Sequence, residues 1–314
     1  MPRLPPTLLR HAYKASPYIP ALMRATRALD TAKIELRWLR EHAATQPRPS
    51  LALQNFVFRR SFLAEPLQYI LGSQPFGAVD ILCRRGVLIP RAETEESASH
   101  LAALLAARGG GAKVVDLCTG TGCIPLLLAA EAQVQAVGVD ISPRALALAM
   151  RNVRHNIGAL KPGSRVEIVE GDLLAAAEEI DQLLYSMHAC FDEMDPEGLH
   201  HKVDVVISNP PYISADGYKR ETTRSVRNWE PRLALEAENG GDVFYPRIGG
   251  IAMELGADAV VAEVGGWDQA ERVQAYWKEM GWIGTAVWKD FAGRGRTVVG
   301  WTDGGEWIKD GPHQ

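Results

Sequence analysis

The stretch Lys113-Val-Val-Asp-Leu-Cys-Thr-Gly-Thr-Gly122 decides the fold class of this 314-residue chain. A short apolar strand runs into a glycine-rich turn, and a helical stretch begins at Ile124. Glycines let such a turn bend tightly and approach a bound ligand closely. A dinucleotide-binding turn would carry a third glycine where this chain has Pro125, which has no amide hydrogen to offer a pyrophosphate. Asp116, just before the turn, would repel a phosphate and attract an ammonium group.

Strands and helices alternate on the carboxyl side of this turn. Ser142 and Pro143 supply the N-cap and the first-turn proline of one of the helices. Further strands are expected at residues 134–139, 166–169, 203–208 and 259–263. This alternation predicts an α/β fold whose mostly parallel sheet has helices on both faces. Ligands of such folds bind beyond the carboxyl ends of the strands.

The first part of the chain has a different pattern. Apolar residues recur every three or four positions from Leu22 to Leu39, which predicts one amphipathic helix. A break at residues 46–49 precedes a second helical stretch at 51–63. We therefore expect three parts: a small helical domain at residues 1–73, a hairpin connector at 74–94 and a catalytic domain at 95–314.

A polar stretch at residues 178–202 separates two expected strands that a shorter connection could join. We interpret this stretch as a surface insertion. Its His200 and His201 are expected to be solvated rather than metal ligands, and no metal site is predicted elsewhere. The four cysteines form no CxxC pair, which is typical of free thiols in a reducing compartment.

Composition narrows the class of protein. With 46% hydrophobic and 23% charged residues the chain can bury a sizeable core. No apolar run approaches the roughly 20 residues that a membrane span requires. The net charge of -4 lacks the basic excess typical of nucleic-acid-binding enzymes, so no direct nucleic-acid substrate is expected.

The first 29 residues carry five basic side chains and no acidic one. Such a composition is typical of a mitochondrial presequence. The alternative is a basic first helix of the mature protein, in which case we expect the protein in the cytoplasm. Composition alone leaves both interpretations open.

Two aspartates follow expected strands and complete a nucleoside site. Asp140 ends the second strand, twenty residues after Gly120, where a carboxylate can accept hydrogen bonds from both ribose hydroxyls. Asp172 follows the third strand and can accept from an adenine amino group. A strand-end cap and a simple turn are the alternatives for these two residues. Together with Asp116 they fit a nucleoside with an amino-acid tail, and S-adenosylmethionine is the predicted cofactor.

The most informative motif is Asn209-Pro-Pro-Tyr212, directly after an expected strand. Its two prolines stiffen the turn, so the Asn209 oxygen and the Pro210 carbonyl are held in place. These two acceptors match the two hydrogens of an NH2 group, and the Tyr212 ring offers a face for a planar amide or base. Hydrogen bonds to both hydrogens raise the electron density on a weakly nucleophilic nitrogen. We predict methyl transfer to a planar amide or amine without a strong general base.

Several segments outside these two motifs are also characteristic. They are Pro66-Leu-Gln-Tyr-Ile-Leu-Gly72, Phe76-Gly77, Gly86-Val-Leu-Ile-Pro-Arg91, Glu93-Thr-Glu95, Glu230-Pro231, Ala234-Leu235 and Lys289-Asp290 with Gly293 and Arg296. From about residue 66 to 300 the chain resembles the HemK-type protein-(glutamine-N5) methyltransferases of peptide-chain release factors. Cys118 stands where that family usually has glycine, and Ala92 replaces its proline.

The resemblance implies a class I methyltransferase with a Rossmann-like sheet, a helical N-terminal domain that is a candidate for substrate docking, and a hairpin connector. The implied acceptor is the glutamine of a release factor's Gly-Gly-Gln loop, which becomes N5-methylglutamine. Residues 178–202 and the acid-free N-terminus look like a eukaryotic, mitochondrial branch. We expect cofactor contacts from Asp116, Cys118, Thr119, Gly120, Thr121, Gly122, Asp140, Asp172, Leu173 and Asn209. We expect the glutamine side chain to bind Asn209, Pro210, Pro211 and Tyr212, with Asn209, Pro210 and Tyr212 taking part in catalysis.

Two other functions compete with this one. An adenine-N6 or other exocyclic-amine methyltransferase uses the same Asn-Pro-Pro-Tyr chemistry. Such an enzyme must extract its base from the stack, and this chain has no evident target-recognition domain. A non-catalytic docking module is the second alternative. It would have no need for both the glycine turn and the acceptor motif, and both are intact.

Overall fold

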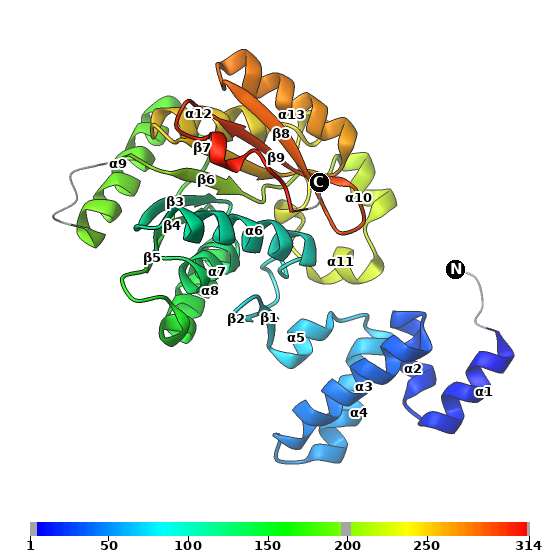
Figure 1. Cartoon of the computed structure of the whole chain (residues 1–314). Helices are drawn as coiled ribbons and strands as arrows, with labels where there is room; N and C mark the ends of the chain where they lie inside the picture. The colour runs from blue at the N-terminus through cyan, green and yellow to red at the C-terminus, as the bar shows by residue number, and fades with distance from the viewer. Residues whose placement is uncertain (1–4, 196–201, 313–314) are drawn as a thin grey trace. The chain divides into compact units, whose positions relative to one another are not determined.

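Two structural units make up the computed structural model, which describes residues 5–195 and 202–312 (Figure 1). The first unit comprises Met1–Gln74, Cys83–Arg85 and Thr222–Glu230. The second comprises Pro75–Leu82, Gly86–Glu221 and Pro231–Gln314. The chain therefore passes between the units several times, although each unit has a hydrophobic core of its own.

The first unit is helical. Its helices are α1 (Pro6–Ala15), α2 (Ile19–Thr26), α3 (Leu29–Ala44), α4 (Pro49–Phe62), α5 (Leu67–Leu71) and α11 (Arg224–Trp229). Leu22, Leu39 and Phe56 bury their side chains in one core, and Ala12 of α1 is fully buried in the same core. The basic first helix is thus a packed part of this unit.

The single helix expected from Leu22 to Leu39 is wrong, because the chain breaks between α2 and α3. Arg27 has a left-handed φ of 62°, and its N–H donates to the Met23 carbonyl to end α2. Both helices turn their apolar faces to the same core, so the spacing of apolar residues continues across the break. Periodicity alone therefore could not reveal it.

The second unit contains a seven-stranded sheet in the order β5-β4-β3-β6-β7-β9-β8. Its strands are β3 (Ala112–Leu117), β4 (Val134–Asp140), β5 (Arg165–Glu170), β6 (Val205–Ser208), β7 (Ala259–Glu263), β8 (Gly284–Lys289) and β9 (Gly295–Trp301). The first five pair in parallel, whereas β9 is antiparallel to both of its neighbours. The predicted mostly parallel α/β sheet is confirmed. The strand order reverses between β3 and β6, which is where ligands bind in such sheets.

Helices cover both faces of this sheet, because successive strand residues point to opposite sides. Val114 and Val205 pack with α6 and α7, whereas Val115 and Val206 pack with α9, α12 and α13 (Figure 1). The α-helices of this unit are α6 (Ala92–Arg108), α7 (Cys123–Glu131), α8 (Pro143–Asn156), α9 (Ala177–Met194), α10 (Ala215–Glu221), α12 (Phe244–Glu254) and α13 (Trp267–Met280). Short 3-10 turns are η1 (Ile157–Ala159), η2 (Arg232–Ala234), η3 (Asn239–Gly241) and η4 (Glu306–Ile308). As predicted, Ser142 caps α8 by accepting a hydrogen bond from the Ala145 N–H.

The surface insertion expected at residues 178–202 is wrong for most of its length. The helix α9 occupies this stretch and packs against β4 and β5. It buries the residues Ile180, Leu183, Met187, Phe191 and Met194. Their spacing of three and four residues is helical, but the polar residues between them concealed it. Residues 196–201, which include His200 and His201, lie outside the described residues.

A two-stranded hairpin, β1 (Ser73–Phe76) and β2 (Val79–Leu82), lies at the start of the expected connector. Two buried amides of α8 bind the free edge of β2. Asn152 Oδ1 accepts from the Leu82 N–H at 2.8 Å, and Asn156 Oδ1 accepts from the Asp80 N–H at 3.0 Å. Asn152 Nδ2 also donates to the Thr121 carbonyl at 2.9 Å, which ties the hairpin to the glycine-rich turn.

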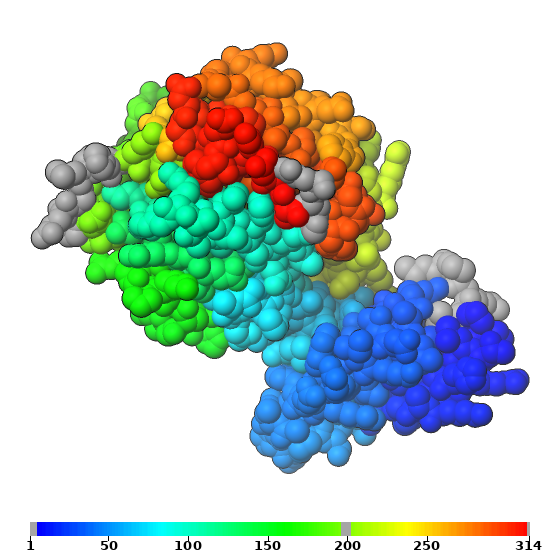
Figure 2. Space-filling view, in the orientation of Figure 1, coloured from blue at the N-terminus to red at the C-terminus, as the bar shows by residue number. Residues whose placement is uncertain are grey.

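The C-terminal segment lies against α6 (Figure 2). The guanidinium of Arg108 stacks over the Trp307 ring at 4.4 Å, and a ring nitrogen of His100 lies 2.8 Å from the Asp310 carbonyl oxygen. These contacts hold the C-terminal segment to α6. Within residues 5–195 and 202–312, no helix is long and apolar enough to cross a bilayer.

Candidate active site

The glycine-rich turn joins β3 to α7 at the carboxyl edge of the sheet. Cys118, Gly120 and Gly122 have positive φ angles of 62°, 56° and 76°. Glycine adopts this conformation freely, whereas a cysteine does so at a cost of about 1–2 kcal/mol. Thr119 holds the turn by donating from Oγ1 to Asp116 Oδ2 at 2.5 Å and from its N–H to β4 at 2.8 Å.

Asp116 is fully buried beneath this turn. Burial raises the pKa of its carboxyl group to about 8. The nearby Asp140 carboxylate also raises this pKa, whereas the hydrogen bond from Thr119 lowers it. Its Oδ1 atom has no hydrogen-bond partner in the described part of the chain. A cationic group bound nearby would lower this pKa and give the carboxyl group a partner.

A cavity of about 250 Å³ lies in front of the turn. Of the ten residues expected to contact the cofactor, six line it, namely Cys118, Gly120, Asp140, Asp172, Leu173 and Asn209. The other four are Asp116, Thr119, Thr121 and Gly122, which shape the turn from behind through the hydrogen bonds and φ angles given above. The tertiary structure thus brings the ends of four strands to one cavity.

Asp140 is held by two backbone donors at the end of β4. Its Oδ2 accepts from the Gly120 N–H and its Oδ1 from the Ser142 N–H, both at 2.8 Å. Burial raises the pKa of this carboxyl group, and the backbone donors oppose the shift. Each carboxylate oxygen keeps a second lone pair for a ligand hydroxyl. Asp172 is arranged similarly, because its Oδ1 accepts from the Leu174 N–H at 2.9 Å.

The apolar walls of the cavity were not predicted from the sequence. They include Val87 and Leu88 after the hairpin, Ile141 after β4, and Leu233 and Phe244 beyond the acceptor motif. The characteristic segment 86–91 was the available signal for the first two, but apolar side chains carry no chemistry that singles them out. Apolar walls with carboxylates at two strand ends fit a nucleoside with a cationic tail.

The acceptor motif follows β6 and contributes to the lining of this cavity. Ser208 Oγ donates to the Leu117 carbonyl at 2.7 Å and joins the motif to the glycine-rich turn. Asn209 lines the large cavity and also a second one of about 20 Å³, which Pro210 and Tyr212 line with it. Pro211 lines the large cavity. The motif therefore stands between the two cavities.

A polar network behind the motif was missed by the sequence analysis. Asn209 Nδ2 donates to Thr94 Oγ1 at 2.9 Å, and Thr94 Oγ1 donates to Glu263 Oε2 at 2.6 Å. The Tyr212 hydroxyl donates to Glu263 Oε1 at 3.0 Å. Burial, followed by the Glu263 carboxylate, raises the pKa of the Tyr212 hydroxyl, so this tyrosine stays protonated. The segment Glu93-Thr-Glu95 was noted in the sequence, but no pattern in its neighbouring residues indicated that Thr94 contacts Glu263 of β7.

Sequence comparisons identify related methyltransferases. A family model described as "Methyltransferase domain" matches residues 114–209. The chain is 34% identical to a probable mitochondrial MRF1 N(5)-glutamine methyltransferase of Schizosaccharomyces pombe, over 95% of this chain and 96% of that protein. It is 32% identical to a release factor glutamine methyltransferase of Geobacter sulfurreducens, over 88% and 92%. Among solved structures, the hMettl16 catalytic domain in complex with the MAT2A 3'UTR hairpin 1 covers 81% of this chain and 80% of its own, with 15% identity and a TM-score of 0.49.

Proposed function

Because this chain belongs to the release factor glutamine methyltransferases, we propose that it methylates N5 of the glutamine in the Gly-Gly-Gln motif of a mitochondrial peptide-chain release factor. S-adenosylmethionine is the methyl donor. The observation that carries the proposal is the position of Asn209, which lines both cavities. A methyl donor in the large cavity and an amide in the small one would meet beside this residue.

We propose that the large cavity binds the cofactor through residues of four strand ends. Asp140 would accept hydrogen bonds from the ribose hydroxyls, and Asp172 and Leu173 would contact the adenine. Cys118 and Gly120 would lie along the amino-acid tail, whose positive charge suits the buried Asp116 carboxyl behind the turn. When bound there, S-adenosylmethionine supplies a methyl group on a positively charged sulfur.

The acceptor motif would orient the glutamine amide. The Asn209 oxygen and the Pro210 carbonyl accept the two amide hydrogens, and the Tyr212 ring lies against the amide plane. These hydrogen bonds strengthen as positive charge develops on the nitrogen, so they favour the transition state over the ground state. A new N–C bond forms while the S–C bond breaks, and the sulfonium charge passes to the nitrogen. The surplus N–H proton then leaves to solvent, so the step needs positioning, worth roughly 7–11 kcal/mol at best, rather than a strong base.

The size of the small cavity limits the substrate. About 20 Å³ of space holds roughly one water molecule. Only the tip of a narrow side chain enters without a larger rearrangement of Leu88, Arg91 and Leu235, which line it. A glutamine carboxamide is narrower than a nucleobase. This supports a protein substrate.

The helical unit is proposed to dock the release factor, and the protein is proposed to act in mitochondria. The relatives from Schizosaccharomyces pombe and Saccharomyces cerevisiae are named as mitochondrial, which supports the second proposal. Expression with a C-terminal fluorescent tag checks the second proposal. A signal confined to the cytosol would overturn it.

Mass spectrometry of a recombinant mitochondrial release factor tests the activity itself. After incubation with S-adenosylmethionine, the peptide that contains Gly-Gly-Gln should gain the mass of one methyl group on glutamine. Parallel reactions with DNA and RNA and a radiolabelled methyl donor distinguish the alternative acceptors. Label in nucleic acid alone, or on another residue of the release factor, would contradict the proposal.

A further inference from the structure

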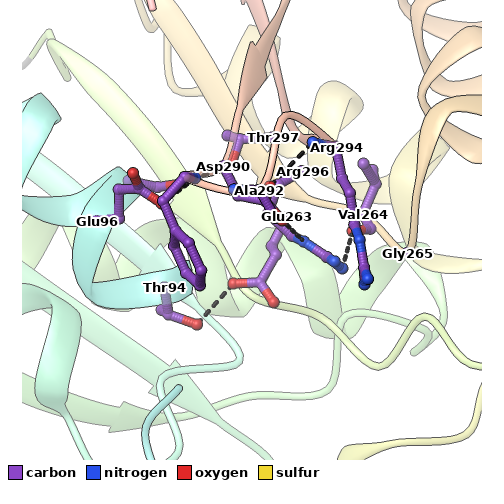
Figure 3. A network of polar contacts seen from close by, with 12 residues as sticks. Thr94, Glu96, Glu263, Val264, Gly265, Asp290, Ala292, Arg294, Arg296 and Thr297 are labelled. Carbon is purple, nitrogen blue, oxygen red and sulfur yellow. Dashed lines mark hydrogen bonds and ion pairs between the residues drawn. The ribbon is translucent and has the colours of Figure 1, made fainter. Parts of the chain in front are cut away.

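The carboxylate of Glu263 lies at the end of β7, where it joins both ends of the acceptor motif. It is 4% exposed and accepts hydrogen bonds from Thr94 and Tyr212, one on each oxygen (Figure 3 shows the Thr94 contact). Thr94 in turn contacts the Asn209 side chain at 2.9 Å. Asn209 and Tyr212 are thus both held, one through Thr94 and the other directly, by a single buried group.

The protons of this network determine which way the Asn209 amide faces. A carboxylate only accepts hydrogen bonds, so the one hydroxyl proton of Thr94 is directed to Glu263. Thr94 Oγ1 is then left with lone pairs alone for Asn209. The atom of Asn209 that contacts it must therefore be the NH2 nitrogen, and the carbonyl oxygen occupies the other side of the amide. An Asn209 amide turned by 180° would place oxygen against oxygen.

We propose that Thr94 and Glu263 are positioning residues that keep the Asn209 carbonyl oxygen turned toward the acceptor nitrogen. Their role rests on the proposed function, in which Asn209 accepts a hydrogen from the glutamine amide. With the opposite orientation an NH2 group would face the substrate NH2, and two donors cannot form a hydrogen bond. The network therefore selects the one orientation of Asn209 that can raise the electron density on the nitrogen.

Polar and charged groups around Glu263 oppose the effect of burial on its carboxyl group, although the net direction of its pKa is upward. Burial raises the pKa of this carboxyl group, whereas the Thr94 and Tyr212 hydroxyls and the Arg296 charge lower it. Arg296 is itself fixed, because its guanidinium donates to the Val264 carbonyl at 3.0 Å and to Asp290 Oδ2 at 3.4 Å (Figure 3). The nearby Glu93 carboxylate acts in the opposite direction. The acceptor role of Glu263 therefore rests on geometry, because Thr94 and Tyr212 each direct a hydroxyl group at one of its oxygens, at 2.6 and 3.0 Å.

Replacement of Thr94 by valine, by serine and by alanine tests the proposal. Thr94→Val keeps the shape of the side chain and removes the hydroxyl, whereas Thr94→Ser keeps the hydroxyl. Ser97→Ala is the matched control, because Ser97 lies one turn further along α6, pairs with Thr297 at 2.7 Å and lines neither cavity. All variants are measured for kcat and KM on the release factor, for binding of S-adenosylhomocysteine and for Tm.

For Thr94→Val we expect kcat to fall about 10- to 100-fold, because misorientation of a group at the reacting atoms costs rates of this size. Affinity for S-adenosylhomocysteine should stay close to that of the wild type, since Thr94 does not line the large cavity. Thr94→Ser should recover most of the lost kcat, and Ser97→Ala should keep the wild-type kcat. Thr94→Ala takes the place of Thr94→Val if the valine variant does not fold.

Equal kcat values for Thr94→Val and Ser97→Ala would overturn the positioning role. So would a Thr94→Ser variant as slow as Thr94→Val at unchanged Tm, because the hydroxyl would then be irrelevant. Wild-type turnover on the release factor is the reference for all variants. Its absence would contradict the proposed function instead, so the two failures are distinguishable.

Discussion

Asn209 and Asp140 line the same cavity. Asn209 follows β6 and Asp140 ends β4, and β3 lies between these two strands in the sheet. All three strands are parallel, so their carboxyl ends lie at one edge. The sheet order reverses between β3 and β6, which leaves this edge open for a ligand. The group proposed to hold the ribose and the group proposed to hold the acceptor are therefore brought together by the topology.

Asn209→Ala should abolish most turnover and spare cofactor binding. The variant loses a hydrogen-bond acceptor whose bond to the substrate strengthens as charge develops on the nitrogen. Loss of such a bond lowers kcat by about 100- to 1000-fold. The cavity keeps Asp140, Asp172 and its apolar walls, so S-adenosylhomocysteine should still bind. Steady-state kinetics and isothermal titration calorimetry measure the two quantities. Wild-type kcat in this variant would refute the acceptor role.

Asp140→Ala should weaken cofactor binding, which Asn209→Ala should spare. Its carboxylate holds the Gly120 and Ser142 N–H groups, and we propose that it also accepts from the ribose. Loss of such an acceptor costs about 1–3 kcal/mol, or roughly 10- to 100-fold in Kd for S-adenosylhomocysteine. Asp181→Ala, on the exposed face of α9, is the control and should bind like the wild type. Equal Kd values for the two variants would count against a ribose contact.

The stability of the cofactor-free protein should depend on the protonation of Asp116. Its pKa is raised from 3.8 to about 8 in the folded state, so between these values the folded protein holds a proton that the unfolded chain has released. The free energy of unfolding therefore decreases as pH rises through this window and levels off above it. Urea denaturation at a series of pH values should show a smaller decrease for Asp116→Asn. Identical pH profiles would mean that Asp116 ionises normally.

Cys118 should tolerate glycine and reject valine. Its φ of 62° suits glycine, whereas a β-branched residue is rarely found there. We expect Cys118→Val to lose about 1–2 kcal/mol of folding stability and to bind S-adenosylhomocysteine more weakly, because the turn would shift. Cys118→Gly should bind at least as tightly as the wild type. Chemical denaturation and calorimetry provide the values, and a valine variant as stable as the glycine variant would contradict the argument.

The buried side chains of α9 should stabilise the folded protein, as expected for a helix that packs in the core. Phe191 is fully buried, and Phe191→Ala should lower the free energy of unfolding by about 3–5 kcal/mol. Tyr185 on the same helix is 76% exposed, so Tyr185→Ala should change it by less than about 0.5 kcal/mol. Thermal and urea unfolding compare the pair. Similar small losses of unfolding free energy for both variants would favour a surface insertion at residues 178–202 over a helix that packs in the core.

The parallel part of the sheet was predictable because each of its strands is a short apolar run that ends at a turn or a polar residue. Asp140 and Ser208 lie within a residue of the expected strand ends. Helices in which polar residues stand among the apolar ones were harder to predict from the sequence. α9 hides its apolar spacing among acidic residues, and the break at Arg27 leaves no trace because both helices face one core.

The sequence by itself determined the five parallel strands, the glycine-rich turn, the stiff acceptor motif and the kind of chemistry that these residue types perform, whereas the antiparallel strands β8 and β9 were not predicted. Those features are local, because a turn or a proline pair acts through the backbone of its own neighbours. Only the tertiary structure placed Thr94 against Asn209, 115 residues away, and brought Glu263 beneath both ends of the motif. Such contacts depend on how α6 packs over the edge of the sheet, and no local pattern encodes a meeting between side chains so far apart in the chain.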